Sequence, residues 1–244
     1  MQNIVLPKAQ EYNLKIDKII DETYDTKTFR MKIPPGLGIN FFPGQFFIVR
    51  FEDSKSLKRA YSISSSPTDR EHLDITMNLV GEFTNRLWKC KINDGLIFAG
   101  PYGKFFFDQE MTQNLILICG GLGITPLRSI IRYCCSKNLP NKMNLIYSAR
   151  TPEGIIYKEE LEQFRKRNMK YQHVFTVTRP KPKHYWGGRT GRIDKELLRI
   201  NIANIEDSLF FICGPLQFVK DVIGMLEDLG AKKLQIKTDI WGEE

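Results

Sequence analysis

The sequence predicts a two-domain protein of the β plus α/β class, because the texture of its 244 residues changes near Gly100. Before that point, short segments rich in β-branched and aromatic residues alternate with turns that contain proline and glycine, which is typical of an antiparallel barrel. After it, strand-like runs alternate with helical patterns, which is typical of a parallel sheet covered by helices on both faces. We therefore expect a six-stranded antiparallel β-barrel within residues 1–108 and a five-stranded parallel sheet flanked by helices within residues 109–244.

The barrel strands are the first elements along the chain. They are separated by turn signals such as Pro34-Pro35-Gly36 and Asn93-Asp94-Gly95. One short helix is expected at Thr84–Cys90, with Thr84 as its N-cap. The six expected strands are Leu14–Ile20, Thr28–Ile33, Gln45–Phe51, Ala60–Ser64, Leu73–Leu79 and Leu96–Ala99.

The second half contains five strand-like runs, and a helical pattern follows each of the first four. In a sheet of this kind, ligands bind beyond the carboxyl ends of the strands, so the turns that follow the strands are the first candidates for a site. The expected strands are Leu115–Cys119, Asn144–Tyr147, Tyr171–Thr178, Leu209–Cys213 and Leu234–Lys237. The expected helices are Pro126–Ser136, Lys158–Arg167, Asp194–Arg199 and Leu216–Leu229.

A glycine-rich turn, Gly120-Gly121-Leu122-Gly123, follows the first of these strands. We expect a helix to begin at about Thr125, with Thr125 as N-cap and Pro126 in the first turn. The free N–H groups at a helix start favour an anion such as phosphate, although on this stretch alone an ordinary βα turn is an equally good interpretation. The turn Cys213-Gly214-Pro215 has a similar form, and two such turns in one sheet favour nucleotide binding.

Composition and charge exclude several classes of protein. Hydrophobic residues make up 42% and charged residues 26%, as in ordinary globular proteins. The N-terminus lacks a signal-peptide pattern and no apolar run approaches the ~20 residues that a membrane span needs, so we expect a soluble cytoplasmic protein. The five cysteines lack metal-binding spacings, so we expect no metal site, iron–sulfur cluster or disulfide framework. The net charge of +8 favours an acidic partner or a phosphorylated ligand, but the basic residues are too dispersed to predict nucleic-acid binding.

The segment Arg59-Ala60-Tyr61-Ser62 stands out within the barrel. On a strand, Arg59 and Tyr61 share one face and Ser62 lies on the other. A guanidinium fork suits a diphosphate, a tyrosine ring suits stacking on a flat heterocycle, and a hydroxyl suits a ring heteroatom. Taken alone, the segment is equally compatible with a surface arginine and a core tyrosine.

Five short motifs occur in a fixed order, and together they identify a family. They are Arg59-Ala60-Tyr61-Ser62, Gly81-Glu82-Phe83-Thr84, Gly100-Pro101-Tyr102-Gly103, Gly120 to Pro126, and Cys213-Gly214-Pro215. In this order the chain resembles the ferredoxin–NADP reductase superfamily of flavin reductases, over nearly its whole length from about Tyr12 to Trp241. The cysteine spacings place the resemblance with members that carry no fused iron–sulfur domain. The resemblance implies an FAD-binding barrel and an NAD(P)-binding α/β domain.

The resemblance also implies roles for particular residues in the barrel. Arg59 would hold the FAD diphosphate, Tyr61 would pack on the isoalloxazine, and Ser62 would lie near flavin N5, followed by Ile63. The turn Gly81–Thr84, including Phe83, would make a second diphosphate contact at a helix start.

In the α/β half, the resemblance assigns Gly121, Gly123, Thr125 and Pro126 to the pyridine nucleotide. Cys213, Gly214 and Pro215 would form the turn where the nicotinamide approaches the flavin. Tyr61, Ser62 and Cys213 are then the expected catalytic residues. The reaction is hydride transfer from NAD(P)H to the flavin, followed by one-electron delivery to an acceptor.

The choice of nucleotide depends on the ends of the second and third strands. Ser148, Arg150, Arg179 and Arg192 suit the 2′-phosphate of NADPH, and the segment 179–192 has five basic residues and no acidic one. We expect NADPH as donor, with NADH and a solvated basic loop as alternatives. FMN in place of FAD stays open.

The electron acceptor is expected to be a separate acidic redox protein, a ferredoxin or flavodoxin, drawn by the positive net charge. Two alternatives stay open. The chain can be an electron-transfer subunit of a larger oxygenase or hydrogenase complex, or a module that keeps the fold without the flavin. Near the end of the chain, Asp239 and Trp241 fall where relatives often have a glutamate and an aromatic residue.

Overall fold

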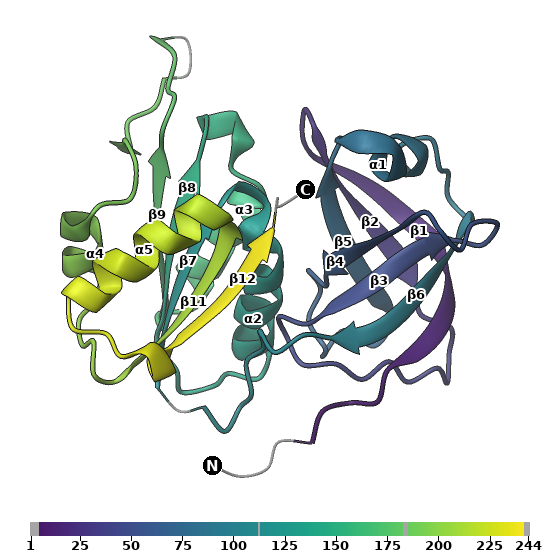
Figure 1. Ribbon diagram of the computed structural model, residues 1–244, viewed down its shortest axis with the longest axis horizontal. Coiled ribbons are helices and arrows are strands. Elements are labelled where there is room, and N and C mark those ends of the chain that lie inside the picture. The colour runs from purple at the N-terminus through teal and green to yellow at the C-terminus, as the bar shows by residue number, and fades with distance from the viewer. Residues whose placement is uncertain (1–4, 112, 183–184, 242–244) are drawn as a thin grey trace. The chain divides into compact units, whose positions relative to one another are not determined.

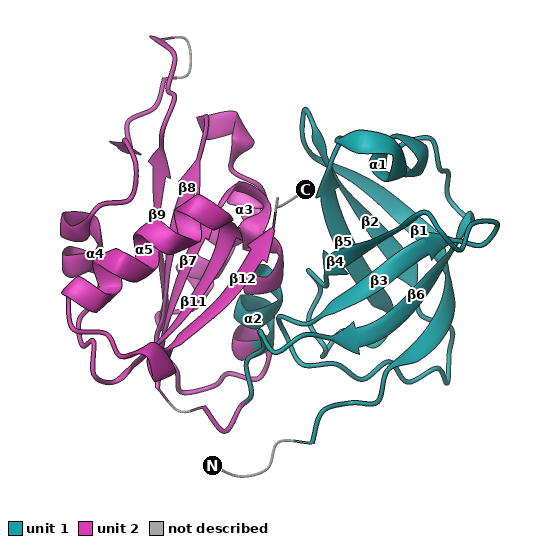
Figure 2. Ribbon diagram, viewed as in Figure 1, with its two compact units in different colours: residues 1–108, 128–133 teal, residues 109–127, 134–244 magenta. Residues whose placement is uncertain are grey.

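The structure, a computed structural model, describes residues 5–111, 113–182 and 185–241. The chain divides into two compact units (Figure 2): residues 1–108 with 128–133 form unit 1, and residues 109–127 with 134–244 form unit 2. Unit 1 contains an antiparallel six-stranded sheet, and unit 2 contains a parallel six-stranded sheet with helices. The predicted β plus α/β class is therefore confirmed.

The six predicted barrel strands all form, in the spatial order β4-β3-β6-β1-β2-β5 (Figure 1). A bridge between Ile63 and Ile75, and a hydrogen bond of 2.9 Å from the Ser64 N–H to the Asp74 carbonyl, join the end of β4 to β5. These two links close the sheet into a barrel. The strands are β1 (Gln10–Thr23), β2 (Thr26–Lys32), β3 (Phe46–Phe51), β4 (Lys58–Ser62), β5 (His72–Asn78) and β6 (Gly95–Tyr102).

The short helix of unit 1, α1, spans Gly81–Leu87, so it begins three residues before the predicted start. Thr84, which was expected to be the N-cap, lies inside the helix, and Val80 holds the N-cap position. The Thr84 hydroxyl hydrogen-bonds back to the backbone of Val80, because a threonine within a helix can satisfy itself on the preceding turn. The N-cap prediction for Thr84 is therefore wrong.

The parallel sheet of unit 2 has the order β10-β9-β8-β7-β11-β12 and one strand more than predicted. The additional strand is the two-residue β10, Arg189–Thr190, which pairs with Thr176 and Val177 of β9. Such a short strand has no hydrophobic pattern that a sequence could display. The others are β7 (Asn114–Gly120), β8 (Met143–Ala149), β9 (Tyr171–Val177), β11 (Ser208–Pro215) and β12 (Ile236–Trp241), the last of which starts two residues later than expected.

Helices cover both faces of this sheet (Figure 1). On one face, α4 (Lys195–Asn201) and α5 (Leu216–Asp228) bury Leu197, Val219 and Leu226 against the isoleucines of β7, β8 and β11. On the other face, α3 (Lys158–Arg167) packs Phe164 edge-on against Tyr171 of β9. Because parallel strands are covered on both sides, β7 and β11 are almost continuously apolar.

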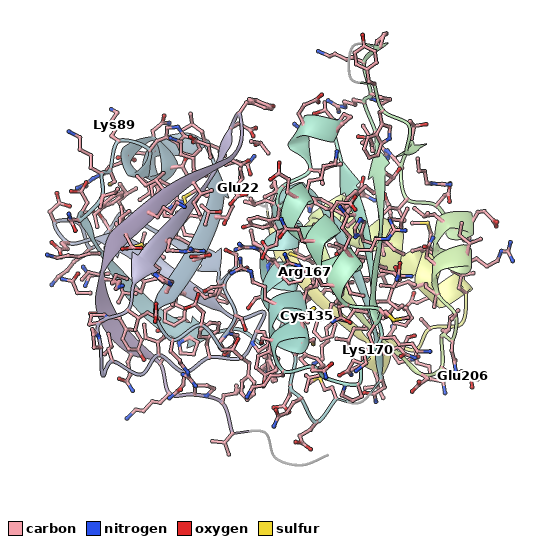
Figure 3. All side chains as sticks on the ribbon, turned by 180° about the vertical axis from the view of Figure 1, so that it is seen from behind. Glu22, Lys89, Cys135, Arg167, Lys170 and Glu206 are labelled. Carbon is pink, nitrogen blue, oxygen red and sulfur yellow. The ribbon has the colours of Figure 1, made fainter. Side chains whose placement is uncertain are left out.

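The remaining helix, α2 (Ile124–Ser136), is shared between the units, since residues 128–133 cluster with the barrel. At its C-terminal end, Cys135 (labelled in Figure 3) accepts a hydrogen bond of 3.2 Å from the Asn168 side chain. Among the described residues, no helix is both long and apolar enough to cross a membrane.

Candidate functional site

Two turns meet at the carboxyl edge of the parallel sheet. The 3₁₀ turn Gly121–Gly123 follows β7, and a Cβ built on Gly123 would lie 2.2 Å from the Cys213 carbonyl oxygen. No side chain fits in that gap, so Gly123 is required for the close approach of the two turns. The structure thus brings together the two glycine turns that the sequence singled out.

Gly121 has a different role from Gly123 in the same turn. Its φ is +55°, and no atom lies within 4 Å of the position a Cβ would take. The backbone of Gly121 therefore borders open space, as a cradle for a bound group requires. Gly121 and Gly123 are suited to ligand approach and to packing, respectively.

The helix α2 begins at Ile124, one residue earlier than expected, and Pro126 lies in its first turn as predicted. Thr125 is inside the helix, and its hydroxyl donates to the Leu122 carbonyl at 3.1 Å. The N-cap prediction for Thr125 is therefore wrong, for the same reason as for Thr84. Thr125 is only 6% exposed and Pro126 is buried.

Phe218 was not selected from the sequence, yet it fits against both turns. A Cβ on Gly214 would lie 2.8 Å from the Phe218 ring, and one on Gly120 would lie 3.4 Å from it. The ring of Phe218, in the first turn of α5, therefore fills the space that side chains at Gly120 and Gly214 would need. Only the glycine beside each neighbouring motif residue hints at such a contact in the sequence.

Cys213 lies at the end of β11 and is 1% exposed. Its neighbours in register are Cys119 on β7 and Asp239 on β12. The Cys213 thiol donates to an Asp239 carboxylate oxygen at an Sγ···Oδ2 distance of 3.7 Å. Burial raises the pKa of Cys213 well above its usual value and the Asp239 carboxylate raises it further, so the thiol stays protonated at neutral pH.

Pro215, the third residue of this turn, is exposed and lies in register with Trp241 of β12. Trp241 is 39% exposed, and a hydrogen bond from its side chain counteracts the raised pKa of Cys213. Trp241 and Asp239 therefore lie at the same edge of the sheet as Cys213, which the loose sequence match near the chain end did not establish.

The basic residues expected to bind a 2′-phosphate lie at the same edge. The Arg179 N–H donates to the Arg150 carbonyl at 2.8 Å, so the backbones after β8 and β9 are adjacent. Gly191, which precedes Arg192, is held by a 2.7 Å hydrogen bond from the Thr176 hydroxyl to its carbonyl. Arg150, Arg179 and Arg192 are exposed and Ser148 is half-buried, so these side chains border solvent.

The loop after β9 carries the rest of the basic cluster. The Trp186 ring N–H donates to the Arg189 carbonyl at 2.8 Å, and the Lys158 ammonium lies 5.6 Å from the centre of the Trp186 ring. The Arg189 guanidinium pairs with Asp194, the N-cap of α4. Arg189 is therefore occupied within the fold, and Lys183 lies outside the described residues.

In the barrel, Arg59 and Tyr61 lie in register with Val49 and Phe47 of β3. Arg59 is exposed, and its guanidinium donates to the Lys58 carbonyl at 2.9 Å. Tyr61 is half-buried, and burial raises its pKa although the Arg59 charge lowers it. Ser62 lies on the other face and is half-buried. A strand with an accessible guanidinium, ring and hydroxyl fits the flavin-binding prediction.

The expected second diphosphate turn has one open position and two enclosed ones. Gly81 has a φ of +74° with no atom within 4 Å of its Cβ position, so its backbone borders open space. Phe83 is 1% exposed and packs at 5.6 Å from the Tyr61 ring. The side chains of Thr84 and Ile63 are also buried, so a ligand here meets mainly backbone.

Comparison with known proteins identifies both units. Residues 13–107 match the family described as oxidoreductase FAD-binding domain, and residues 117–223 match the oxidoreductase NAD-binding domain. The chain belongs to the ferredoxin–NADP reductase superfamily. The predicted resemblance is thereby confirmed, and with it the expectation that FAD and a nicotinamide nucleotide are the cofactors.

Three similar proteins indicate the range of this superfamily. The chain is 29% identical over 90% of its length to 61% of a glycine betaine monooxygenase reductase subunit from Chromohalobacter salexigens. It is 30% identical over 81% of its length to 53% of one subunit of the Na(+)-translocating NADH-quinone reductase from Yersinia enterocolitica. A ferredoxin NADP+ reductase from Neisseria gonorrhoeae, crystallised with FAD and NADP, has 25% identity and a TM-score of 0.79, with 96% of this chain and 99% of that chain covered. The chain thus spans only part of the length of the first two relatives.

The packing of Gly123 yields a stability prediction. We expect Gly123→Ala to lower the free energy of unfolding by about 1–3 kcal/mol, because its Cβ would overlap the Cys213 carbonyl. Chemical denaturation followed by circular dichroism measures this change. Gly224→Ala is the matched control, since Gly224 lies within α5 with no atom within 4 Å of its Cβ position. That variant should be more stable by up to ~1 kcal/mol, and equal stability of the two variants would contradict the packing role.

Proposed function

We propose that this protein is an FAD-dependent NAD(P)H reductase that takes a hydride from the nicotinamide and passes electrons to a separate acceptor. The proposal is carried by one observation: each cofactor-family match contains an expected phosphate turn whose glycine, Gly81 or Gly121, borders open space at positive φ. Residues 1–108 would form the FAD-binding domain and residues 109–244 the NAD(P)-binding domain. The flavin, when bound, supplies the hydride-accepting and one-electron chemistry.

The barrel residues act by binding and orientation. Arg59, exposed and charged, would hold the flavin diphosphate through its guanidinium fork. Tyr61 would pack its ring on the flavin, since Phe83 fixes it from beneath at 5.6 Å. The Ser62 hydroxyl would hydrogen-bond near flavin N5, and Ile63, Phe83 and Thr84 would contribute through their backbone or by supporting the turn at Gly81.

The α/β residues position the donor. The open backbone at Gly121, with Gly123, Thr125 and Pro126 shaping the helix start, would hold the nucleotide phosphates. Cys213, Gly214 and Pro215 would border the nicotinamide. Because the Cys213 thiol is buried and protonated, its role is to orient the ring, and no side chain needs to act as a general base.

NADPH is the proposed donor, on the grounds that Arg150, Arg179 and Arg192 border solvent at the carboxyl edge, with Ser148 beside them. NADH is the alternative, supported by the naming of a relative as part of an NADH-quinone reductase. The five cysteines are all free thiols, which suits the reducing cytoplasm that we propose as the location.

The decisive experiment is the absorbance spectrum of the purified protein before and after addition of each donor. We expect a flavin spectrum that bleaches anaerobically, with a higher kcat/KM for NADPH than for NADH. Heat extraction and chromatography of the released flavin separate FAD from FMN. A colourless protein that cannot be reconstituted with FAD or FMN would refute the function, whereas a strong preference for NADH would refute only the donor assignment.

Cys213→Ala tests the positioning role of the thiol. We expect the hydride-transfer rate in stopped flow to fall by about 10- to 100-fold, because a displaced nicotinamide leaves the reactive geometry. The dissociation constant of NADP+ should change far less. Cys119→Ala is the matched control, since Cys119 is an equally buried thiol in register on β7. Small and equal effects on rate and binding would contradict the role of Cys213.

The acceptor is proposed to be an acidic ferredoxin or flavodoxin, because the net charge of +8 favours electrostatic steering. The rate of reduction of such a protein should fall about tenfold or more as ionic strength rises from low to high, while reduction of an uncharged dye stays constant. Equal salt dependence for the protein and the dye would contradict steering.

A second function is favoured by one observation: a relative is named as a reductase subunit of a monooxygenase. The chain would then be the electron-transfer subunit of a larger oxygenase complex. Dye reduction does not separate the two functions. A tagged chain purified from its own host, with the co-purified proteins identified, does so, because an oxygenase component would be recovered only in the second case.

A further inference from the structure

Helix α2 is built into both units. Its middle turn, residues 128–133, clusters with the barrel (Figure 2), whereas residues on either side of it belong to unit 2. The helix starts at Ile124, directly after the glycine turn Gly121–Gly123. Whatever fixes residues 128–133 therefore also bears on the start of the same rigid helix, which carries the proposed nucleotide turn.

Asp74 of β5 is the centre of the contacts made by this turn. Its carboxylate is fully buried, and Arg30 of β2 forms two hydrogen bonds with it, at 2.9 Å and 3.0 Å. The Arg128 guanidinium lies 3.3 Å from the other side of the same carboxylate, and that of Arg132 lies 3.9 Å from it. One buried carboxylate thus joins a barrel strand to two arginines of α2.

Two serines tie the same turn to the chain that follows the proposed flavin motif. Arg128 also donates to the Ser64 carbonyl at 3.2 Å, and the Ser129 hydroxyl donates to the Ser65 carbonyl at 2.6 Å. The Ser65 hydroxyl in turn accepts from the Asp74 N–H at 3.0 Å. Residues 64 and 65 come two and three positions after Ser62, so the cluster lies at the end of the flavin-motif segment.

A third layer of hydrogen bonds holds Ser64 in place. Its hydroxyl lies 3.2 Å from that of Thr76, which lies 2.7 Å from that of Thr28. Thr28 also donates to Glu22 at 2.6 Å, a residue of β1 that Figure 3 labels. The cluster is therefore anchored in three strands of the barrel and is not free to follow the helix.

The carboxylate is charged at neutral pH. Burial alone would raise the pKa of Asp74, but the hydrogen bond from Arg30 and the charges of Arg128 and Arg132 outweigh burial and lower it. Buried ion pairs contribute little net stability compared with an apolar core of similar volume, because of the cost of desolvation. Their fixed geometry is the property that an apolar contact lacks.

We infer that Asp74 is a positioning residue, which acts through Arg128 to hold α2 so that the glycine turn at its start presents the donor for hydride transfer. The inference rests on the proposed assignment of Gly121–Pro126 to NAD(P)H. The alternative is that the cluster only stabilises the barrel. The two roles differ in what Arg128 does, because Arg30 and Arg128 bind the same carboxylate but only Arg128 belongs to α2.

The test compares Arg128→Met with Arg30→Met in the flavin-loaded protein. Four quantities are measured for each: flavin content, reduction by dithionite, the dissociation constant of NADP+ by calorimetry, and the hydride-transfer rate. We expect Arg128→Met to retain flavin and dithionite reduction but to lose about 10- to 100-fold in hydride transfer. Arg30→Met should change that rate by less than about twofold. Arg128→Lys, which keeps a charge near Asp74, should recover part of the loss.

Equal effects of the two methionine variants on hydride transfer, or loss of flavin from both, would overturn the inference and leave a stabilising role. An unchanged rate in Arg128→Met would overturn it as well. Asp74→Asn should reproduce the Arg128→Met profile, and the two arginine variants decide the matter if Asp74→Asn does not fold. If neither NADPH nor NADH reduces the wild-type flavin, the proposed function itself fails, and this result precedes any comparison of variants.

Discussion

The contact between Gly123 and the Cys213 carbonyl is the constraint on which the carboxyl edge of the parallel sheet depends. With 2.2 Å between a would-be Cβ and that oxygen, the two turns can meet only if position 123 has no side chain. The meeting fixes the end of β11, and with it the thiol of Cys213 and its contact with Asp239. Phe218 then closes the space beside Gly120 and Gly214. An edge built from backbone in this way is rigid before any nucleotide arrives.

The barrel reaches the same end through aromatic packing. Phe83 lies between Phe51, at 5.0 Å, and Tyr61, at 5.6 Å, so the ring of Tyr61 is held by the core on which it rests. Arg59, two residues away on the same face, has no such support and stays exposed. The motif therefore combines a fixed ring with an adaptable charge. A flat heterocycle needs the first and a flexible diphosphate tolerates the second.

Elements with a strong hydrophobic period were predictable, and local hydrogen bonds were not. The alternation in β1 and β3 and the spacing in α3 placed these elements within a few residues. Thr84 and Thr125 failed as N-caps because a threonine hydroxyl can bond either to a following N–H or to a preceding carbonyl, and the sequence does not state which. The strand β10 was missed because two residues carry no period. Asp74 and Arg128 were missed because their contact spans the two predicted domains in sequence.

The nature of that missed contact bears on how α2 is held. An apolar patch between α2 and the barrel would bury the same surface without the cost of desolvating four charged groups. It would also allow the helix to rotate or slide by small steps, since apolar contacts have little direction. Arg128 instead meets a carboxylate and a carbonyl at once, and Ser129 meets a second carbonyl, which fixes both the rotation and the axial position of the turn. Directional bonds of this kind are what a helix needs if its first residues must present a ligand at a fixed place.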